Sequence, residues 1–189
     1  MTEKLQRILP KVQKPARYVG GEYNAVVKNK DEIEVRVAFC FPDLYELGMS
    51  NLGFRILYGV MNGMPGVWCE RVFAPWGDME QAMRDNEIPL FALESRDPVK
   101  DFDMIAFSLG YEMSYTNVLN MLLLAGVPLH ADEREGLQNI VFADDDFFYF
   151  VEDRSVAVIH VGLLLFHFQR RGAFTHAPAG EDLIECRVI

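Results

Sequence analysis

Residues 34–62 read EVRVAFCFPDLYELGMSNLGFRILYGVMN, and this stretch decides the fold. Residues 34–41 alternate at first and then become continuously apolar, which is typical of a strand that enters a sheet covered on both faces. Pro42 ends that strand. After a loop, Ser50 is predicted to cap a helix over residues 51–62. One face of this helix carries apolar residues at helical spacing: Leu52, Ile56, Leu57 and Val60. The stretch therefore predicts a β-loop-α unit.

The same alternation of strand and helix continues along the chain. Apolar runs predict four more strands and two more helices, with the strands at residues 67–73, 89–93, 103–109 and 139–143 and the helices at residues 78–86 and 114–125. Gly126 follows the last helix at the position favoured for a left-handed cap. This alternation favours right-handed crossovers between parallel strands. The predicted fold is a doubly wound, Rossmann-like α/β domain with a mostly parallel sheet.

The chain divides into three predicted regions. Residues 1–30 combine prolines and a Gly20-Gly21 pair with many charges, which favours an extended N-terminal arm. Residues 31–143 form the Rossmann-like domain. Residues 144–189 begin with three aspartates and continue with an apolar stretch of no assignable period, so their fold is left open. We expect limited proteolysis to cut this last region first, before Ala179.

Composition excludes several classes of partner. Half of the 189 residues are hydrophobic, which is enough to fill a core, and the net charge is −10. Such a charge repels phosphate backbones and anionic lipids, so nucleic acid and membranes are not expected as partners. Basic residues gather in the first 30 positions, but with almost no aromatic residues between them, which favours a solvated arm or one packed on an acidic neighbour over RNA binding. The longest apolar run, residues 156–168, is shorter than the roughly 20 residues of a membrane span.

The cysteines and the N-terminal sequence indicate a reducing compartment. Cys40, Cys69 and Cys186 are odd in number and form no paired motif, which argues against a disulfide framework and against a zinc site. The first 15 residues have no apolar core of signal-peptide length. We therefore expect a cytoplasmic protein.

Two loops are the candidate binding site, because ligands of open parallel sheets bind outside the carboxyl ends of the strands. Residues 41–53 offer Gly48 and Gly53 for close backbone approach, and a helix N-terminus at Ser50. Residues 108–117 are rich in hydroxyl and amide groups that could bond the polar rim of a large cofactor. The alternative is that Ser50 and Ser114 only cap helices.

Catalysis by this chain alone is not supported by these loops. Asp43, Glu46 and Glu112 provide carboxylates, but neither loop contains a histidine or cysteine to complete an acid-base or nucleophilic set. The four histidines, at positions 130, 160, 167 and 176, lack the short spacing of metal pairs. Trp76 either stacks on a ligand or packs beside its proline neighbour. No GxxxxGK[ST] or GxGxxG motif occurs.

Several strings resemble a known family. They are LPKVQKPARYVGGEYNAVVK, FPDLYELGMSNLGFRILY, ERVFAPWGDMEQAMR and IPLFALESRDPVKDFDMIAFSLGYEMSYTNVLNMLLLAGVPL. From about residue 9 to residue 134, the chain resembles the N-terminal region of radical S-adenosylmethionine (radical SAM) proteins with a cobalamin-binding-type domain. The resemblance implies a cobalamin face built from residues of both loops: Asp43, Tyr45, Glu46, Gly48, Met49, Ser50, Ser108, Tyr111, Glu112, Ser114 and Thr116.

Three departures from the family pattern predict that cobalamin binding is weak or lost. Methionine-synthase-like cobalamin domains supply a histidine to cobalt from a DxHxxG loop, whereas the corresponding stretch of this chain, DLYELG, has none. A glycine-rich GGP turn usually follows the fifth strand, where this chain reads NIVFADDD and adds carboxylates that repel a phosphate. The CxxxCxxC motif that binds the iron–sulfur cluster is absent, and 189 residues leave no room for the barrel that carries it.

The resemblance leads to one leading hypothesis and two alternatives. The leading hypothesis is a cofactor-binding or docking module that is not catalytic by itself. One alternative is a subunit that acts in trans with a separate radical SAM barrel, and the other is a nonfunctional gene fragment. After about residue 136 the sequence no longer follows the family, which a frameshift or recombination would explain as well as an acquired segment.

Overall fold

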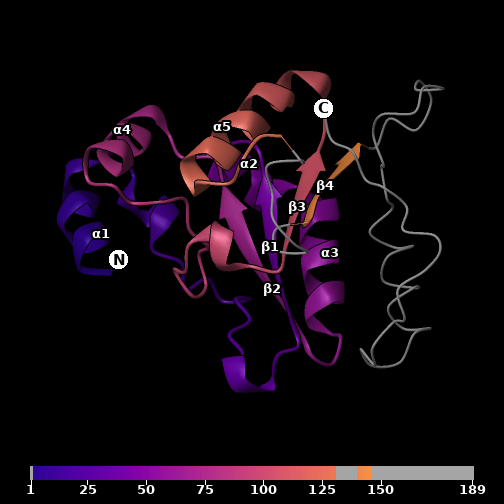
Figure 1. Cartoon of the computed structure of the whole chain (residues 1–189). Helices are drawn as coiled ribbons and strands as arrows, with labels where there is room; N and C mark the ends of the chain where they lie inside the picture. Colours follow the sequence, from indigo (N-terminus) through magenta and orange to yellow (C-terminus); the bar gives the residue numbers. More distant parts are fainter. Residues whose placement is uncertain (1, 131–139, 146–189) are drawn as a thin grey trace.

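The computed structural model describes residues 2–130 and 140–145, and its centre is a parallel β-sheet (Figure 1). The sheet has four strands in the order β2-β1-β3-β4, and all three neighbouring pairs are parallel. The strands are β1 (Val35–Phe41), β2 (Val67–Phe73), β3 (Met104–Leu109) and β4 (Ile140–Asp145). The predicted α/β fold with a parallel, Rossmann-like sheet is confirmed.

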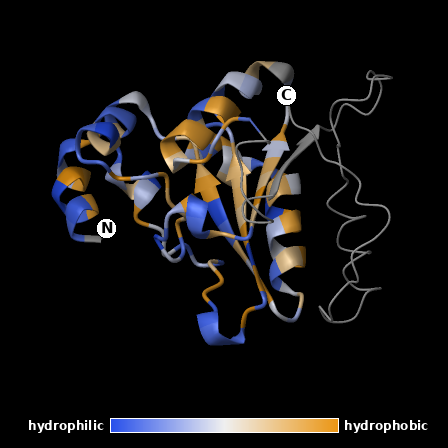
Figure 2. Cartoon of the chain, viewed as in Figure 1, coloured by the Kyte–Doolittle hydropathy of each residue, from blue (hydrophilic) through white to orange (hydrophobic). Residues whose placement is uncertain are grey.

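Helices cover both faces of the sheet. Along β1, Phe39 packs in one hydrophobic cluster with Phe54 of α3 (Leu52–Asn62), and their rings are stacked with centroids 4.3 Å apart. The next residue, Cys40, belongs to the other cluster, together with residues of α4 (Gly77–Asp85) and α5 (Tyr115–Ala125). Successive side chains of a strand point to opposite faces, so α3 covers one face and α4 with α5 the other. Figure 2 shows hydrophobic residues on the strands between these layers.

Asn51, and not Ser50, caps α3. The Asn51 side-chain oxygen accepts a hydrogen bond from the backbone N–H of Phe54 at 2.9 Å. Ser50 is instead the last residue of a short helix, α2 (Tyr45–Ser50), and its hydroxyl donates to the Leu47 carbonyl. The prediction of a Ser50 cap is wrong because the first loop contains this extra helical turn. The cap at Gly126 is confirmed, with φ of 72° and N–H bonds to the last turn of α5.

The predicted strand at residues 89–93 is wrong. This segment makes scattered backbone bonds instead of a ladder: Leu90 N–H donates to the Leu124 carbonyl, and Leu93 N–H donates to the Arg71 carbonyl of β2. The chain then turns back on itself, and Phe91 forms an isolated antiparallel bridge with Pro98. Proline has no N–H to extend such a pairing into a ladder.

The N-terminal segment is not extended throughout. Residues Thr2–Ile8 form helix α1, and short 3-10 helices follow at Leu9–Lys11, Pro15–Tyr18 and Lys30–Glu32. Leu5 and Ile8 are buried in the same hydrophobic cluster as residues of α4 and α5. The expectation of an extended arm is therefore wrong for residues 2–8, which supply side chains to the core. Two further 3-10 turns lie at Val99–Asp101 and Glu112–Ser114.

Predictions for residues 131–139 and 146–189 lie outside the described residues. They include the apolar run at 156–168 and all but the first two residues of the region expected to be cut first by protease. Within the described part of the chain, no helix is long and apolar enough to cross a membrane.

Leu5→Ala tests whether the N-terminal helix belongs to the folded core. Leu5 is 1% exposed, so we expect the substitution to lower the free energy of unfolding by about 2–5 kcal/mol. The matched control is Leu52→Ala, at a leucine that is 68% exposed, for which we expect a change within about 0.5 kcal/mol. Urea unfolding measures both. Equal effects of the two substitutions would contradict the packing of α1 on the core.

Candidate functional site

The direction in which successive strands are added to the sheet reverses between β1 and β3. From β1 the chain moves to β2 on one side, and from β2 it crosses to β3 on the other side of β1. In doubly wound sheets this reversal opens a crevice at the carboxyl ends of the two central strands. The two loops predicted as the candidate site start there, directly after Phe41 of β1 and Leu109 of β3.

Two hydrogen bonds join these loops across the reversal. The Tyr111 hydroxyl donates to a carboxylate oxygen of Asp43 at 3.1 Å, and the Asn117 side-chain amide donates to the Pro42 carbonyl at 2.8 Å. The hydrogen bond to Asp43 raises the pKa of Tyr111. The second Asp43 oxygen accepts the backbone N–H of Leu44. The loops are thus brought together as predicted, and the protein's own groups hydrogen-bond them to each other.

Glu46 of α2 is held by the N-terminal segment. Its carboxylate forms ion pairs with Arg17 at 2.9 Å and with Lys14 at 3.2 Å. The hydrogen bond from Arg17 lowers the pKa of Glu46 to about 2. The Arg17 guanidinium also lies 5.8 Å from the centre of the Trp76 ring. Trp76 follows β2, and its backbone N–H donates to the Tyr18 hydroxyl at 3.1 Å. The N-terminal segment therefore lies against the carboxyl ends of β1 and β2.

Tyr45 and Met49 of α2 face inward, toward charges that the sequence analysis did not identify. The Tyr45 hydroxyl donates to Glu22 at 3.0 Å, and the Arg71 guanidinium lies 3.2 Å from the Met49 sulfur. Burial raises the pKa of Tyr45 to about 12. Arg71 is in turn paired with Glu94 at 2.6 Å and with Glu22 at 2.8 Å. The Arg71 and Glu94 side chains are buried, whereas Tyr45 and Met49 are half-buried and pack against the hydrophobic cluster that contains Phe54 and Phe73.

A second set of charges lies on the opposite face of β2. Glu70 accepts a hydrogen bond from Arg36 at 2.5 Å and another from the backbone N–H of Ser95 at 2.8 Å. Arg36 also pairs with Asp97 and lies 4.2 Å from the centre of the Phe102 ring. The signal that could have revealed both sets is the adjacent pair Glu70-Arg71 inside the otherwise apolar strand VWCERVF, because buried charges need partners.

Of four further predicted site residues, two donate hydrogen bonds to nearby backbone carbonyls, and the other two are described by their position in the fold. Ser114 is buried, and its hydroxyl donates to the Tyr111 carbonyl at 2.6 Å. Thr116 is exposed, and its hydroxyl donates to the Met113 carbonyl. Ser108 lies near the end of β3 and is half-buried. Glu112 lies in the turn that precedes α5. The role of all these residues in binding a ligand stays a prediction.

Gly48 approaches an aromatic ring of the protein. A Cβ atom at this position would lie 2.8 Å from Cδ1 of Phe73, closer still to Cε1 of that ring, and 3.0 Å from Cγ of Phe41. Such contacts are shorter than real Cβ atoms make, so only glycine fits. The sequence analysis assigned close backbone approach at Gly48 to ligand binding, whereas in the structure the group nearest to Gly48 is the Phe73 ring of the protein itself.

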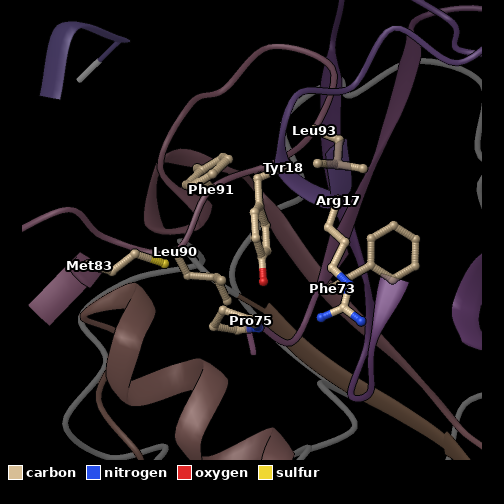
Figure 3. A pocket seen from close by; sticks show the side chains of 8 residues that line it. All are labelled: Arg17, Tyr18, Phe73, Pro75, Met83, Leu90, Phe91 and Leu93. Atoms are coloured by element: carbon tan, nitrogen blue, oxygen red, sulfur yellow. The ribbon is translucent and has the colours of Figure 1, made fainter. Parts of the chain in front are cut away.

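Two cavities lie beside the N-terminal segment. One is a small cavity of about 20 Å³, shown in Figure 3, and the other is a groove of about 430 Å³. The small cavity is lined by Arg17, Tyr18, Phe73, Pro75, Met83, Leu90, Phe91 and Leu93, and the groove by Val19, Gly21, Ala25, Val27, Leu93, Glu94, Ser95 and Arg96. The small cavity holds about one water molecule. Neither is lined by a residue of the predicted cobalamin face.

The described residues offer no preformed metal or thiol chemistry. No group of three or more histidine, cysteine, aspartate or glutamate side chains in this part of the chain could hold a metal ion. Cys40 and Cys69 are buried free thiols, and burial raises the pKa of both. A nucleophilic cysteine needs a lowered pKa and access to solvent, so neither thiol is suited to that role.

Comparison with known protein families gives a match for this chain. The family model described as radical SAM proteins, N-terminal, matches residues 53–152. The match covers more than half of the chain, from α3 through the strands β2, β3 and β4. It extends past residue 136, so the expectation that the sequence leaves the family at about that position is wrong. The chain belongs to this family. No curated protein and no solved structure matches the chain. The resemblance to radical SAM N-terminal regions is therefore confirmed at the level of the family.

Gly48→Ala tests the packing of α2 on the end of β2. The added methyl group would displace the Phe73 ring, and we expect the free energy of unfolding to fall by about 1–3 kcal/mol. The control is Gly59→Ala in α3, where a Cβ meets nothing within 4 Å and a helical alanine should stabilise by about 0.5–1 kcal/mol. Chemical unfolding measures both substitutions, and the changes in the free energy of unfolding should have opposite signs. Unchanged stability in Gly48→Ala would contradict the contact with Phe73.

Proposed function

We propose that this chain is a docking module that presents the carboxyl edge of its sheet to a radical SAM catalytic core and is not catalytic by itself. Membership of the radical SAM N-terminal family supports the association with such a core. The observation that carries the proposal is the pair of hydrogen bonds that join the two loops, from the Tyr111 hydroxyl to Asp43 and from the Asn117 amide to the Pro42 carbonyl. Doubly wound folds ordinarily bind a ligand at this point. Here the polar groups form hydrogen bonds within the chain instead.

In this proposal, the radical SAM catalytic core supplies the chemistry of the reaction. The sequence has no CxxxCxxC motif, so the iron–sulfur cluster of a radical SAM reaction would be bound by another region or another subunit. The carboxylates of this edge are already engaged: Asp43 by Tyr111 and by a backbone N–H, and Glu46 by Arg17 and Lys14. In the proposed role these residues fix the shape of the edge.

The residues of this edge do not fit cobalamin. A corrin ring would need the loops after β1 and β3 to separate, which would break the Tyr111–Asp43 and Asn117–Pro42 hydrogen bonds. The loop after β1 has no histidine for an axial bond to cobalt. The Asn117–Pro42 bond is partly buried, so breaking it would cost stability, whereas the Tyr111–Asp43 bond is exposed to solvent. We therefore propose that cobalamin binding is weak or lost, and derive no step through cobalamin.

Association in trans tests the docking role. The probe is a purified radical SAM protein of the same family from which its own N-terminal region has been deleted. We expect the full chain to bind this probe one to one, with a dissociation constant of about 10 µM or tighter, measured by isothermal titration calorimetry. The control is the intact radical SAM protein, whose own N-terminal region fills the docking surface, so binding should be at least about tenfold weaker. Absence of binding to the deleted probe would refute the role.

Titration with hydroxocobalamin tests the cofactor. We expect the visible spectrum of hydroxocobalamin to stay unchanged on addition of the chain, and calorimetry to give a dissociation constant weaker than about 100 µM. Free imidazole serves as the positive control, because it shows the spectral change that a nitrogen ligand on cobalt produces. Stoichiometric binding at submicromolar concentration would show that the crevice opens for the cofactor.

A further inference from the structure

β2 is an edge strand among the described strands, and it pairs with β1 on one side. The Gly66 carbonyl, just before β2, accepts the backbone N–H of Val35 at 3.0 Å and so points toward β1. Because backbone groups alternate in direction along a strand, those of Val67, Cys69 and Arg71 point outward, away from the sheet. Outward groups of this kind are a template on which another strand can add.

The outward groups of Cys69 and Arg71 bond to side chains and to a loop instead of to a strand. The Cys69 N–H donates to the Asn62 side-chain oxygen at 3.1 Å, and the Asn62 side-chain N–H donates back to the Cys69 carbonyl at 2.9 Å. The amide of Asn62 thus bonds Cys69 as the peptide group of a neighbouring strand would. The Arg71 N–H donates to Glu94 at 2.8 Å, and the Arg71 carbonyl accepts the Leu93 N–H at 2.9 Å.

Lys28 of the N-terminal segment continues this row of bonds. Its ammonium group donates to the carbonyl of Val67, the first residue of β2, and to the carbonyl of Asn62, the last residue of α3, the latter at 2.7 Å. The carboxyl end of a helix carries partial negative charge, so a cation is favoured there. One lysine therefore holds the end of α3 and the start of β2 together.

We propose that Lys28 and Asn62 form an edge guard, which keeps the β2 edge closed to strand addition by a second copy of this chain. An added strand would need the outward groups of Val67 and Cys69, and these are occupied within the chain. A second copy is the relevant partner because two identical edges can pair about a twofold axis. β2 reads VWCERVF and is rich in residues that favour strand pairing. The inference does not depend on the proposed docking role.

The N-terminal segment repeats this arrangement at another helix, which provides the matched control. Lys4 donates to the Asn86 carbonyl at 3.0 Å, as Lys28 does to the Asn62 carbonyl. The Asn86 side chain donates to the carbonyl four residues earlier, as Asn62 does to Tyr58. Lys4 and Asn86 meet at the end of α4, whereas Lys28 and Asn62 also reach the backbone of β2.

The experiment compares two double variants of the full chain, each of which removes one lysine and one asparagine. Sedimentation velocity is measured at about 0.3 M salt, where the repulsion between copies of net charge −10 is screened. Lys28→Ala with Asn62→Ala should dimerise reversibly, at least about tenfold more tightly than the parent chain. Lys4→Ala with Asn86→Ala should stay within about twofold of the parent chain.

Hydrogen exchange shows whether the β2 edge is the surface that pairs. In the parent chain, the Cys69 amide should exchange about 100-fold or more slowly than an unprotected amide. In the variant that lacks the edge guard, this amide should exchange fast at low protein concentration and slowly again as dimers form. Dimers that leave the Cys69 amide unprotected would place the contact at another surface and overturn the inference.

A third variant, Lys28→Ala with Asn62→Asp, separates edge pairing from loss of stability. Aspartate also lacks the N–H donors of Asn62, but its charge at the edge opposes pairing, so this variant should associate no more tightly than the parent chain. If it dimerises like the alanine variant, association follows from destabilisation and the inference is wrong. The inference is also wrong if the alanine variant melts cooperatively but dimerises no more tightly than the parent. Should the alanine variant fail to fold, fast exchange of the Cys69 amide in the parent chain would refute the edge guard.

Discussion

The ion pair between Arg71 and Glu94 is the interaction on which the packing around β2 depends. Glu94 is fully buried, and burial raises the pKa of its carboxyl group. The pair connects β2 to the segment after residue 93, and Glu22 and Tyr58 extend the connection to the N-terminal segment and to α3. Removing one partner of such a pair typically costs about 3–5 kcal/mol, because it leaves an uncompensated buried charge.

The charged residues Glu70 and Arg71 lie in β2, an edge strand of the sheet, and each has its own partner of opposite charge. Glu70 and Arg71 are adjacent in β2, so their side chains point to opposite faces and each meets its own partner, Arg36 or Glu94. An exposed edge strand invites pairing with other chains. Here the Leu93 N–H donates a hydrogen bond to the Arg71 carbonyl, and the Trp68 ring N–H donates one to the Val26 carbonyl. The charged groups thus hold the segments that cover this edge.

The parts of the fold that could be predicted from sequence are those set by local periodicity and turns. The apolar runs of β1, β2 and β3 and the glycine after α5 specify their structure within a few residues. The segment at residues 89–93 has the apolar composition of a strand, but its residues are buried without a strand ladder. The location of the candidate site followed from the strand order, but the bonds from Tyr111 to Asp43 and from Arg17 to Glu46 join residues 68 and 29 positions apart. Such contacts leave no periodic signal in one sequence.

The edge at the strand reversal differs from a ligand pocket in what its polar groups do. A pocket keeps donors and acceptors free for a ligand, whereas here the hydroxyl of Tyr111, the amide of Asn117 and the carboxylate of Glu46 are already bonded within the chain. Any ligand at this point would have to replace these bonds with others of equal quality. A protein surface that meets the edge from outside can leave these bonds in place, which is the arrangement that the proposed docking role requires.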